Sequence, residues 1–367
     1  MRVLVTGADG FIAKNLIIRL QEIGVEIVKF TRKNHLSDLQ LIIPEVDFIF
    51  HLSGVNRPQS AIEFSIDNYN FTAELCKLIK KNEQHISIVY TSSVQAEQGN
   101  PYGVSKLQGE EELLKLVDLN IANVAIYRLP NVFGKWSKPN YNSVVATFCY
   151  NTIYNIPLTI RDTSSLVNLV YIDDLIDSFL KFLQLGIKKL ERPTINNQYL
   201  ITVGKLAEII QSFKSERKEG YIGPVGTGLI RALYSTYLSF YQPKSFKYGL
   251  EPISDLRGKF VEIFKTADFG QVSFFTIYPG MTRGGHYHHT KNEKFIVAEG
   301  SARFKFRHII SNETYEIMTN GKTPEVVETI PGWSHDITNI GTNEMIVIIW
   351  ANEVFDKKLA DTIPYKV

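Results

Sequence analysis

The chain has 367 residues, which is enough for about two domains of ordinary size. Hydrophobic residues make up 44% of it and charged residues 21%, which excludes disordered, collagenous and low-complexity proteins. With 40 basic and 38 acidic residues, the net charge of +2 argues against a nucleic-acid partner. Only two cysteines are present, and no apolar run reaches the about 18 residues of a membrane helix. We therefore expect a cytoplasmic protein without a membrane partner.

The first part of the chain alternates strand and helix patterns. Strand-like apolar runs occur at residues 2–6, 25–30, 46–51, 86–90 and 124–127, and helical spacing occurs at 11–23, 62–80 and 102–117. Strands that alternate with helices of this length predict a Rossmann-fold α/β domain, with a doubly wound parallel sheet and helices on both faces.

The pattern changes after residue 220, where glycine and proline break the chain. From Asp255 onward, short alternating runs are separated by turns, which predicts an all-β sandwich or barrel. We place the boundary near residue 245, so the expected domains are residues 1–245 and 246–367.

The turn after the first strand has the features of a dinucleotide site. Gly7 allows a tight turn, Gly10 lets the backbone approach a pyrophosphate, and the small Ala13 allows close packing of the helix on the strand. The N–H groups of Phe11 and Ile12 begin that helix, whose N-terminus attracts phosphate. A tight turn without a ligand is the simpler alternative, but its position in the first βα unit favours a nucleotide.

The second strand ends at Thr31 and Arg32. An acidic side chain at this point would hold the ribose 2′-hydroxyl of NAD, whereas a basic one accommodates the 2′-phosphate of NADP. Arg32 therefore favours NADP(H), although an exposed arginine can also be a solvated surface charge.

A tyrosine and a lysine spaced four residues apart follow the fourth strand. Tyr102 and Lys106 would share one face of a helix, where the ammonium lowers the tyrosine pKa and the phenol can give a proton to a carbonyl oxygen. The strand ends in Thr91, Ser92 and Ser93, whose hydroxyl groups can polarise the same carbonyl.

These motifs occur in the order seen in extended short-chain dehydrogenase/reductases, which the chain resembles over residues 1–220. Two further segments share the resemblance, Arg128-Leu-Pro-Asn131-Val-Phe-Gly134 and Val170-Tyr-Ile-Asp-Asp174. The resemblance implies Tyr102 as the acid, Lys106 as its activator and Thr91 as the hydroxyl partner, with Ser92 and Ser93 as alternatives to Thr91. It also implies cofactor contacts at Leu52 and Gly54, after the third strand.

The C-terminal part contains a candidate metal site. His286 and His288 can point to one face of a strand, and Glu293 with His335 would complete a set that suits Zn, Fe, Ni or Mn. Isolated histidines are more often structural, which is how we interpret His289 and His308. The spacing resembles the two motifs of cupins, and this resemblance implies a jelly-roll barrel with a metal at these four residues.

The pairing of these two domains is similar to a family of capsular polysaccharide and O-antigen synthesis enzymes. Residues 138–150 and 288–295 carry that resemblance. It implies a homodimeric enzyme of UDP-N-acetyl-L-fucosamine biosynthesis with one Zn²⁺ per chain. The cupin would epimerise C3 of a UDP-linked 4-keto-6-deoxy-HexNAc, and NADPH would then reduce C4 to give UDP-2-acetamido-2,6-dideoxy-L-talose.

Several alternatives remain open from the sequence. The C3 base could be His288, His335, Glu293 or Lys294, although a metal ligand is a poor base. The cupin could instead be a structural or dimerisation module beside an active reductase. A nucleotide sensor without catalysis and a cupin dioxygenase are two further interpretations.

Overall fold

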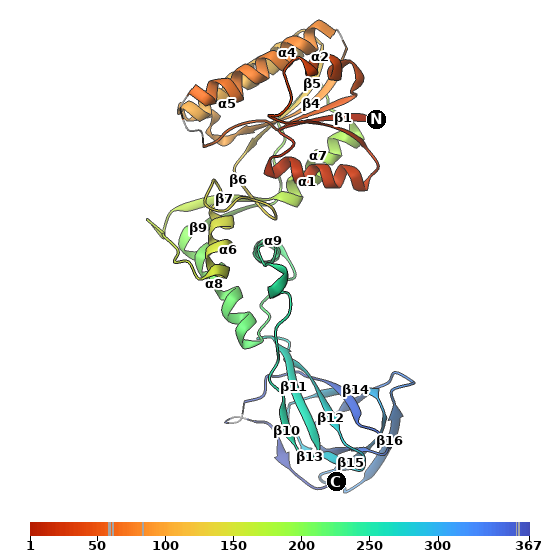
Figure 1. The fold of residues 1–367 in the computed structure, drawn as a ribbon. Helices are drawn as coiled ribbons and strands as arrows, with labels where there is room; N and C mark the ends of the chain where they lie inside the picture. The colour runs from red at the N-terminus through yellow and green to blue at the C-terminus, as the bar shows by residue number, and fades with distance from the viewer. Residues whose placement is uncertain (58–59, 61, 83, 357, 359) are drawn as a thin grey trace. The chain divides into compact units, whose positions relative to one another are not determined.

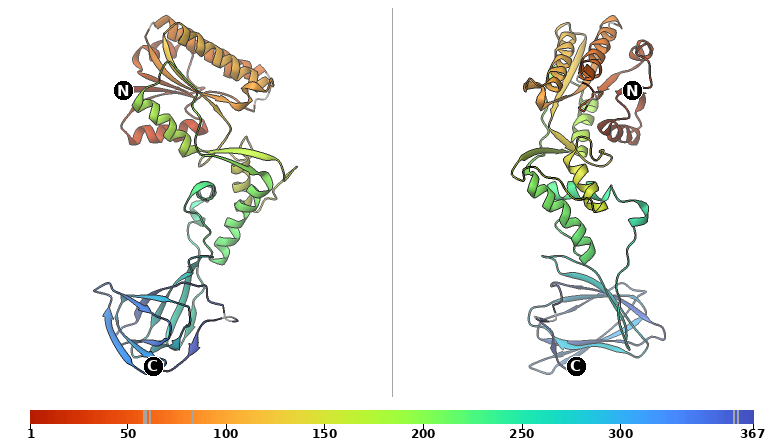
Figure 2. Two further views of the ribbon diagram at one scale, coloured as in Figure 1. Left: turned by 180° about the vertical axis from the view of Figure 1, so that it is seen from behind. Right: turned by 60° about the vertical axis from the view of Figure 1, so that its left-hand side comes forward.

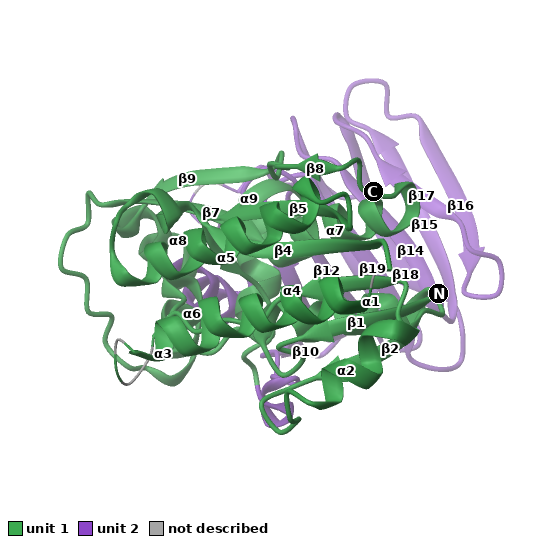
Figure 3. Cartoon of the chain, turned by 90° about the horizontal axis from the view of Figure 1, so that it is seen from above, with its two compact units in different colours: residues 1–211, 226–241 green, residues 212–225, 242–367 purple. Residues whose placement is uncertain are grey.

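The computed structural model describes residues 1–57, 60, 62–82, 84–356, 358 and 360–367. The chain forms two compact units, which Figure 3 shows in different colours. The first contains Met1–Gln211 and Gly226–Tyr241, and the second contains Ser212–Val225 and Gln242–Val367. The short segment before residue 226 groups with the second unit because the Ile222 N–H donates to the Lys265 carbonyl and the Lys265 N–H to the Gly220 carbonyl, both at 2.9 Å.

A parallel sheet forms the centre of the first unit (Figure 1). Its strands pair in the order β2-β1-β3-β4-β5-β8, and all of these pairs are parallel. The strands are β1 (Arg2–Thr6), β2 (Glu26–Phe30), β3 (Phe48–His51), β4 (Ile86–Ser93), β5 (Ala122–Leu129) and β8 (Leu190–Glu191). The predicted parallel α/β fold is thus confirmed.

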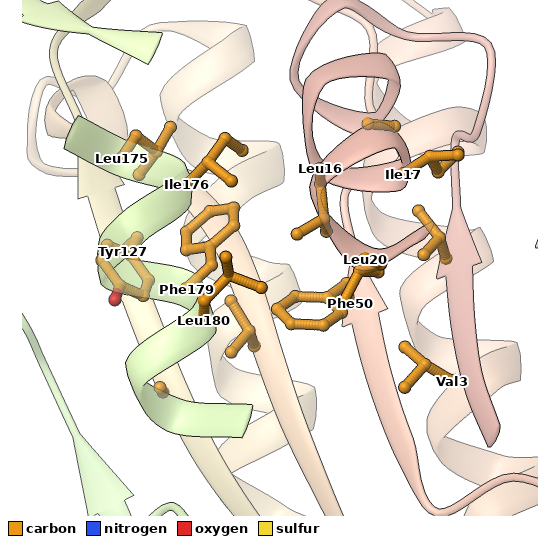
Figure 4. Packing of buried hydrophobic residues seen from close by; sticks show 14 of the residues in the cluster. Val3, Leu16, Ile17, Leu20, Phe50, Tyr127, Leu175, Ile176, Phe179 and Leu180 are labelled. Atoms are coloured by element: carbon orange, nitrogen blue, oxygen red, sulfur yellow. The ribbon is translucent and has the colours of Figure 1, made fainter. Parts of the chain in front are cut away.

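Helices cover both faces of this sheet. They are α1 (Phe11–Glu22), α2 (Asp38–Ile42), α4 (Phe71–Asn82), α5 (Pro101–Asp118) and α7 (Ile172–Leu185). Figure 4 shows Leu16 and Leu20 of α1 with Phe179 of α7 packed around Phe50 of β3. On the other face, side chains of α2, α4 and α5 form a second buried cluster. Each fully buried side chain of this size contributes about 1.5–3 kcal/mol.

The region predicted as one helix at 62–80 is interrupted. It consists of α3 (Ile62–Phe64), a π-helical turn η2 (Ser65–Asn70) and α4. The buried side chain of Asn68 lies in this turn and bonds to the loop after β3, with its Oδ1 accepting from the Val55 N–H at 2.7 Å. A polar contact of this kind is not visible in hydrophobic spacing.

Smaller elements complete the first unit. A three-strand sheet has the order β6-β7-β9, and helices α6 and α9 pack together. The elements are β6 (Asn131–Phe133), β7 (Leu166–Tyr171), β9 (Gln198–Thr202), α6 (Val144–Tyr154), α9 (Gly228–Leu238) and α8 (Val203–Glu219), which continues into the second unit. Single 3₁₀ turns are η1 (Ile43–Glu45) and η3 (Val94–Glu97) in this unit and η4 (Pro243–Ser245) in the second unit.

The second unit consists of two antiparallel sheets, which Figure 2 shows from two further sides. Their orders are β10-β11-β12-β19-β14-β17 and β16-β15-β18-β13-β20. The strands are β10 (Ile253–Asp255), β11 (Gly258–Lys265), β12 (Gln271–Ile277), β13 (Thr282–Tyr287), β14 (Glu293–Glu299), β15 (Ser301–His308), β16 (Thr314–Asn320), β17 (Val326–Thr329), β18 (Trp333–Asn339), β19 (Met345–Ala351) and β20 (Ile363–Pro364).

Alternation along the strands builds the core of this unit. In β15, Ala302, Phe304 and Phe306 are buried, while Arg303 and Lys305 lie on the opposite face. The buried residues join apolar side chains of both sheets in one cluster. The prediction of an all-β C-terminal part is confirmed as an antiparallel β-sheet domain. Across the described residues of both units, every helix is too short or too polar to span a bilayer.

Candidate functional site

The turn between β1 and α1 lies at the carboxyl end of the parallel sheet. Gly7 has a φ of +65°, and a Cβ on it would lie 2.8 Å from the Cα of Ser53, so both conformation and space require glycine. The Gly10 N–H donates to the Gly7 carbonyl at 2.8 Å and closes the turn. Phe11 and Ile12 follow as the first residues of α1. The four predicted residues of the turn thus lie together at a helix N-terminus, an arrangement that suits a pyrophosphate.

The other predicted cofactor residues lie at the same edge of the sheet. Thr31 and Arg32 follow β2, whereas Leu52 and Gly54 follow β3, and these strands flank β1 on its two sides. Such a switch in strand order is where nucleotides bind in open α/β sheets. The Arg32 side chain is 79% exposed, and its Nη2 lies 3.0 Å from Asp67 Oδ2. An exposed pair of this kind contributes little stability, so Arg32 is available to a phosphate.

Helix α5 brings Tyr102 and Lys106 to the ends of β3 and β4. The Asn100 side chain caps the helix by accepting from the Gly103 N–H at 2.8 Å. Lys106 is 4% exposed, and its Nζ donates to the Thr91 carbonyl at 2.9 Å. Burial lowers the pKa of Lys106 to about 8, against the opposing charge of Glu110. The ammonium is therefore close to titrating at neutral pH.

The three hydroxyl groups at the end of β4 point to different partners. Thr91 Oγ1 donates to the His51 carbonyl at 3.5 Å, and Ser92 Oγ donates to Glu110. Ser93 is the one whose side chain bonds to Tyr102. The structure thus places Ser93 beside the phenol and turns Thr91, the expected partner, toward β3. Alternation along a strand separates Ser92 from Thr91 and Ser93, but the sequence does not show which of those two lies beside Tyr102.

The pKa of Tyr102 differs in direction from the sequence expectation. Burial raises it above its usual value, and the hydrogen bond with Ser93 opposes that shift only in part. The phenol consequently keeps its proton at neutral pH and can act as a proton donor.

Four side chains of the second unit converge on one point. His286 of β13, His288 just after that strand, Glu293 of β14 and His335 of β18 each place one ligand atom within 4.8 Å of the others. Glu293 Oε2 lies 3.4 Å from His288 Nε2 and 3.3 Å from His335 Nε2. Lys291 Nζ lies 2.7 Å from the other oxygen, Oε1. The structure therefore brings together all four predicted ligands.

The ionisation of these groups suits a cation. Burial, with the nearby His335, lowers the pKa of His286 to about 4, so its ring is neutral at pH 7. Burial alone would raise the pKa of Glu293, but its contacts with His288 and His335 and the charge of Lys291 hold it below the usual value. Neutral imidazoles and an ionised carboxylate are the forms that bind metal.

The surroundings of His288 provide a further test of whether these four residues fit a metal ion. Its Nδ1 donates to the Asp361 carbonyl, which orients the ring so that Nε2 faces Glu293. Among the described residues, this buried Nε2 has no hydrogen-bond partner. A cation between this buried nitrogen and the carboxylate would give both groups a partner. Three nitrogens and one oxygen form a donor set that fits Zn²⁺.

Other residues near this cluster have separate roles. Lys294, one of the suggested bases, pairs with Glu328 on the face of β14 opposite to Glu293. The His289 N–H donates to Asp361 Oδ1 at 2.9 Å, and His308 Nδ1 bonds to Ser311 Oγ at 2.9 Å. Sequence reasoning missed Asp361, which lies far along the chain from the four ligands and belongs to none of their motifs.

Two protein families match this chain, one in each of its two compact units. Residues 3–196 match the NAD dependent epimerase/dehydratase family, and this match spans more than half of the chain. The chain belongs to the NAD-dependent epimerase/dehydratase family. Residues 253–363 match the polysaccharide biosynthesis C-terminal domain.

Individual relatives resemble the whole chain. It is 53% identical over 363 residues, 99% of this chain and 98% of the relative, to the UDP-2-acetamido-2,6-beta-L-arabino-hexul-4-ose reductase of Pseudomonas aeruginosa. The capsular polysaccharide assembling protein CapF from Staphylococcus aureus has a TM-score of 0.93 and 39% identity, with 100% of both chains covered. A UDP-glucuronic acid 4-epimerase from Bacillus cereus has a TM-score of 0.55 and 18% identity, over 65% of this chain and 98% of that chain, which shows a shared fold.

Proposed function

We propose that this chain is a bifunctional nucleotide-sugar enzyme with two catalytic domains, residues 1–245 and 246–367. The first domain reduces the 4-keto group of a UDP-linked 2-acetamido-2,6-dideoxy-hexulose with NADPH. The second, a metal-binding cupin, inverts C3 beforehand, so that the product is UDP-2-acetamido-2,6-dideoxy-L-talose for capsule or O-antigen synthesis. The observation that carries the reductase part is similarity along nearly the whole chain to a UDP-hexulose reductase.

The reductase chemistry is assigned to the side chains of β4 and α5. NADPH, when bound at the turn after β1, would supply a hydride to C4. The Tyr102 phenol, protonated at neutral pH, donates its proton to the C4 oxygen, and Ser93 hydrogen-bonds to the same oxygen in place of Thr91. The buried Lys106 ammonium stabilises the tyrosinate that forms. Arg32 would donate hydrogen bonds to the 2′-phosphate that distinguishes NADP from NAD.

The epimerase chemistry is assigned to the cluster between the two β-sheets. His286, His288, Glu293 and His335 would hold the ion, with Asp361 orienting His288. A bound Zn²⁺ would supply Lewis-acid polarisation of the sugar carbonyl, which acidifies the proton at C3. An apolar ring lies beside the cluster, with 6.1 Å between the ring centroids of His335 and Phe295. Lys294 is left out because it faces away from this cluster.

A second candidate keeps the reductase and makes the β-domain a structural or dimerisation module. The convergence of four ligand groups, three of them buried, argues for the first candidate, because a module that only supports a dimer needs no such cluster. We propose a homodimer in either case.

Deuterium incorporation separates the two activities. The keto-sugar is incubated in D₂O with the zinc-loaded enzyme, with and without NADPH, and C3 is examined by NMR. Label at C3 without NADPH supports epimerisation, and NADPH consumption supports reduction. The matched variants are His286→Ala and His289→Ala, since His289 is exposed and lies outside the cluster. Loss of label in His286→Ala alone is expected, whereas unlabelled C3 in the wild type rules out the epimerase.

A further inference from the structure

A buried histidine that the mechanism above does not use lies at the end of β3. The His51 side chain is fully buried, and its ring stacks on Tyr90 with 5.3 Å between centroids. Its Nδ1 lies 2.7 Å from Thr6 Oγ1, and its Nε2 lies 2.9 Å from Thr72 Oγ1. It thus connects three elements of the first unit, β1, β3 and α4.

The neighbouring hydrogen bonds define where each proton lies. Thr72 Oγ1 donates to the Asn68 carbonyl at 2.6 Å, so it must accept from His51, whose proton is therefore on Nε2. Nδ1 is then unprotonated and accepts from the Thr6 hydroxyl. Burial, together with the charge of Lys106, lowers the pKa of His51 to about 3, so this tautomer is neutral at every physiological pH.

These hydrogen bonds continue from His51 to Thr6, whose Oγ1 binds the backbone of the loop after β3. With its hydroxyl proton given to His51, Thr6 Oγ1 has lone pairs free to accept from the Leu52 N–H at 3.2 Å and the Ser53 N–H at 3.3 Å. Both of these backbone groups belong to the loop that contains the predicted cofactor residues Leu52 and Gly54.

The backbone of this loop lies close to both halves of the proposed reductase site. On one side, a Cβ on Gly7 of the dinucleotide turn would lie 2.8 Å from the Ser53 Cα. On the other side, a Cβ on Gly54 would lie 2.8 Å from Lys106 Nζ. A shift of a few tenths of an ångström in Leu52–Gly54 therefore alters the spacing between the turn and the lysine.

We propose that His51 is a positioning residue for the nicotinamide cofactor, acting through Thr6 on the backbone of Leu52 and Ser53. It touches neither cofactor nor substrate. As a neutral Nε2–H imidazole it directs the Thr6 hydroxyl and so sets the distance between the Gly7 turn and Lys106. The inference rests on the proposed reductase function.

The test measures NADPH binding directly, by fluorescence titration without sugar. His51→Leu removes both hydrogen bonds, whereas His51→Gln can still accept from Thr6 and donate to Thr72. We expect His51→Leu to raise the Kd for NADPH about tenfold and His51→Gln to raise it less than about threefold, since the bond that directs the Thr6 hydroxyl is worth about 1–1.5 kcal/mol net. The KM for NADPH should rise in parallel, with the KM for the sugar unchanged.

Two further measurements keep the outcome decisive. Thr6→Val removes the hydroxyl that accepts from the loop, with little change in volume, and should weaken NADPH binding as much as His51→Leu does. Thr6→Val therefore takes the place of His51→Leu if the latter fails to fold. In ¹⁵N-labelled wild type, the ring should show a protonated Nε2 and a bare Nδ1. The opposite tautomer, or folded variants that bind NADPH as the wild type does, overturns the inference. A wild type that binds no NADPH instead overturns the proposed function.

Discussion

Replacing Lys106 by methionine should stabilise the first unit while abolishing reduction. The lysine is 4% exposed, and burial lowers its pKa from 10.5 to about 8. A depression of this size corresponds to about 3 kcal/mol of lost stability when both states are protonated. Removing the ammonium also removes its bond to the Thr91 carbonyl, which is worth about 1 kcal/mol. We therefore expect Lys106→Met to be more stable than the wild type by about 2 kcal/mol at pH 7.

The pH dependence provides an independent check that the lysine destabilises the folded state. The folded pKa of Lys106 lies below the unfolded value, so between about 8 and 10.5 the unfolded state binds more protons. The stability of the wild type therefore rises with pH between about 8 and 10.5, as the buried ammonium loses its proton. Below that window the full cost of burying the charge applies at every pH. The advantage of Lys106→Met should consequently be largest at pH 7 and disappear toward pH 10.5.

Urea titration followed by hydrogen exchange of peptides from β4 and α5 reports the first unit alone, which matters because the chain has two compact units. Lys115→Met is the matched control on the same helix, since that side chain is 64% exposed, and it should change stability little. If Lys106→Met is less stable than the wild type at pH 7, or its advantage persists at pH 10.5, the reasoning about burial is refuted.

Four further predictions concern the two sites. Tyr102→Phe should lower kcat by about 10²–10⁴-fold in a keto-sugar assay, and retained activity would contradict its role as acid. Ser93→Ala should lower kcat by about 10²-fold and Thr91→Val by less than about threefold. A larger loss in Thr91→Val than in Ser93→Ala would instead identify Thr91 as the hydroxyl partner of Tyr102. Arg32→Ala should raise the KM for NADPH about tenfold and leave that for NADH unchanged, so parallel changes would exclude a phosphate contact. Glu293→Gln should weaken zinc binding by at least about tenfold in a chelator competition, and equal affinity would remove it from the ligand set.

The candidate sites could be predicted where a motif is local in the chain. Gly7 and Gly10 sit in one turn, and Tyr102 and Lys106 share one helix, so spacing alone relates them. The hydroxyl partner could not be chosen this way, because Thr91, Ser92 and Ser93 differ only in which neighbour each one faces. The packing of α5 against β4 decides that direction, through contacts that are distant in the sequence.

The arrangement of the metal cluster likewise could not be predicted from local spacing alone. His286 and His288 were predicted to share one face of a strand, yet β13 ends at Tyr287 and the two rings still converge, with 5.0 Å between centroids. The pairing of β13 with β18 sets His335 opposite His286, and Asp361 then orients His288. Partners of this kind come from separate strands, so their identity depends on the completed sheets.

The sequence by itself determined the alternation of strands and helices over the first 129 residues, the change from α/β to all-β structure and the residue types of both sites. These follow from periodicity and short-range spacing, which a single chain segment specifies. Only the tertiary structure decided the π-helical turn around Asn68, the contact of the Ser93 side chain with Tyr102 and the series of hydrogen bonds from Asn68 through His51 to Leu52. Each depends on buried polar groups that must find partners from other elements, and those partners exist only once the elements have packed.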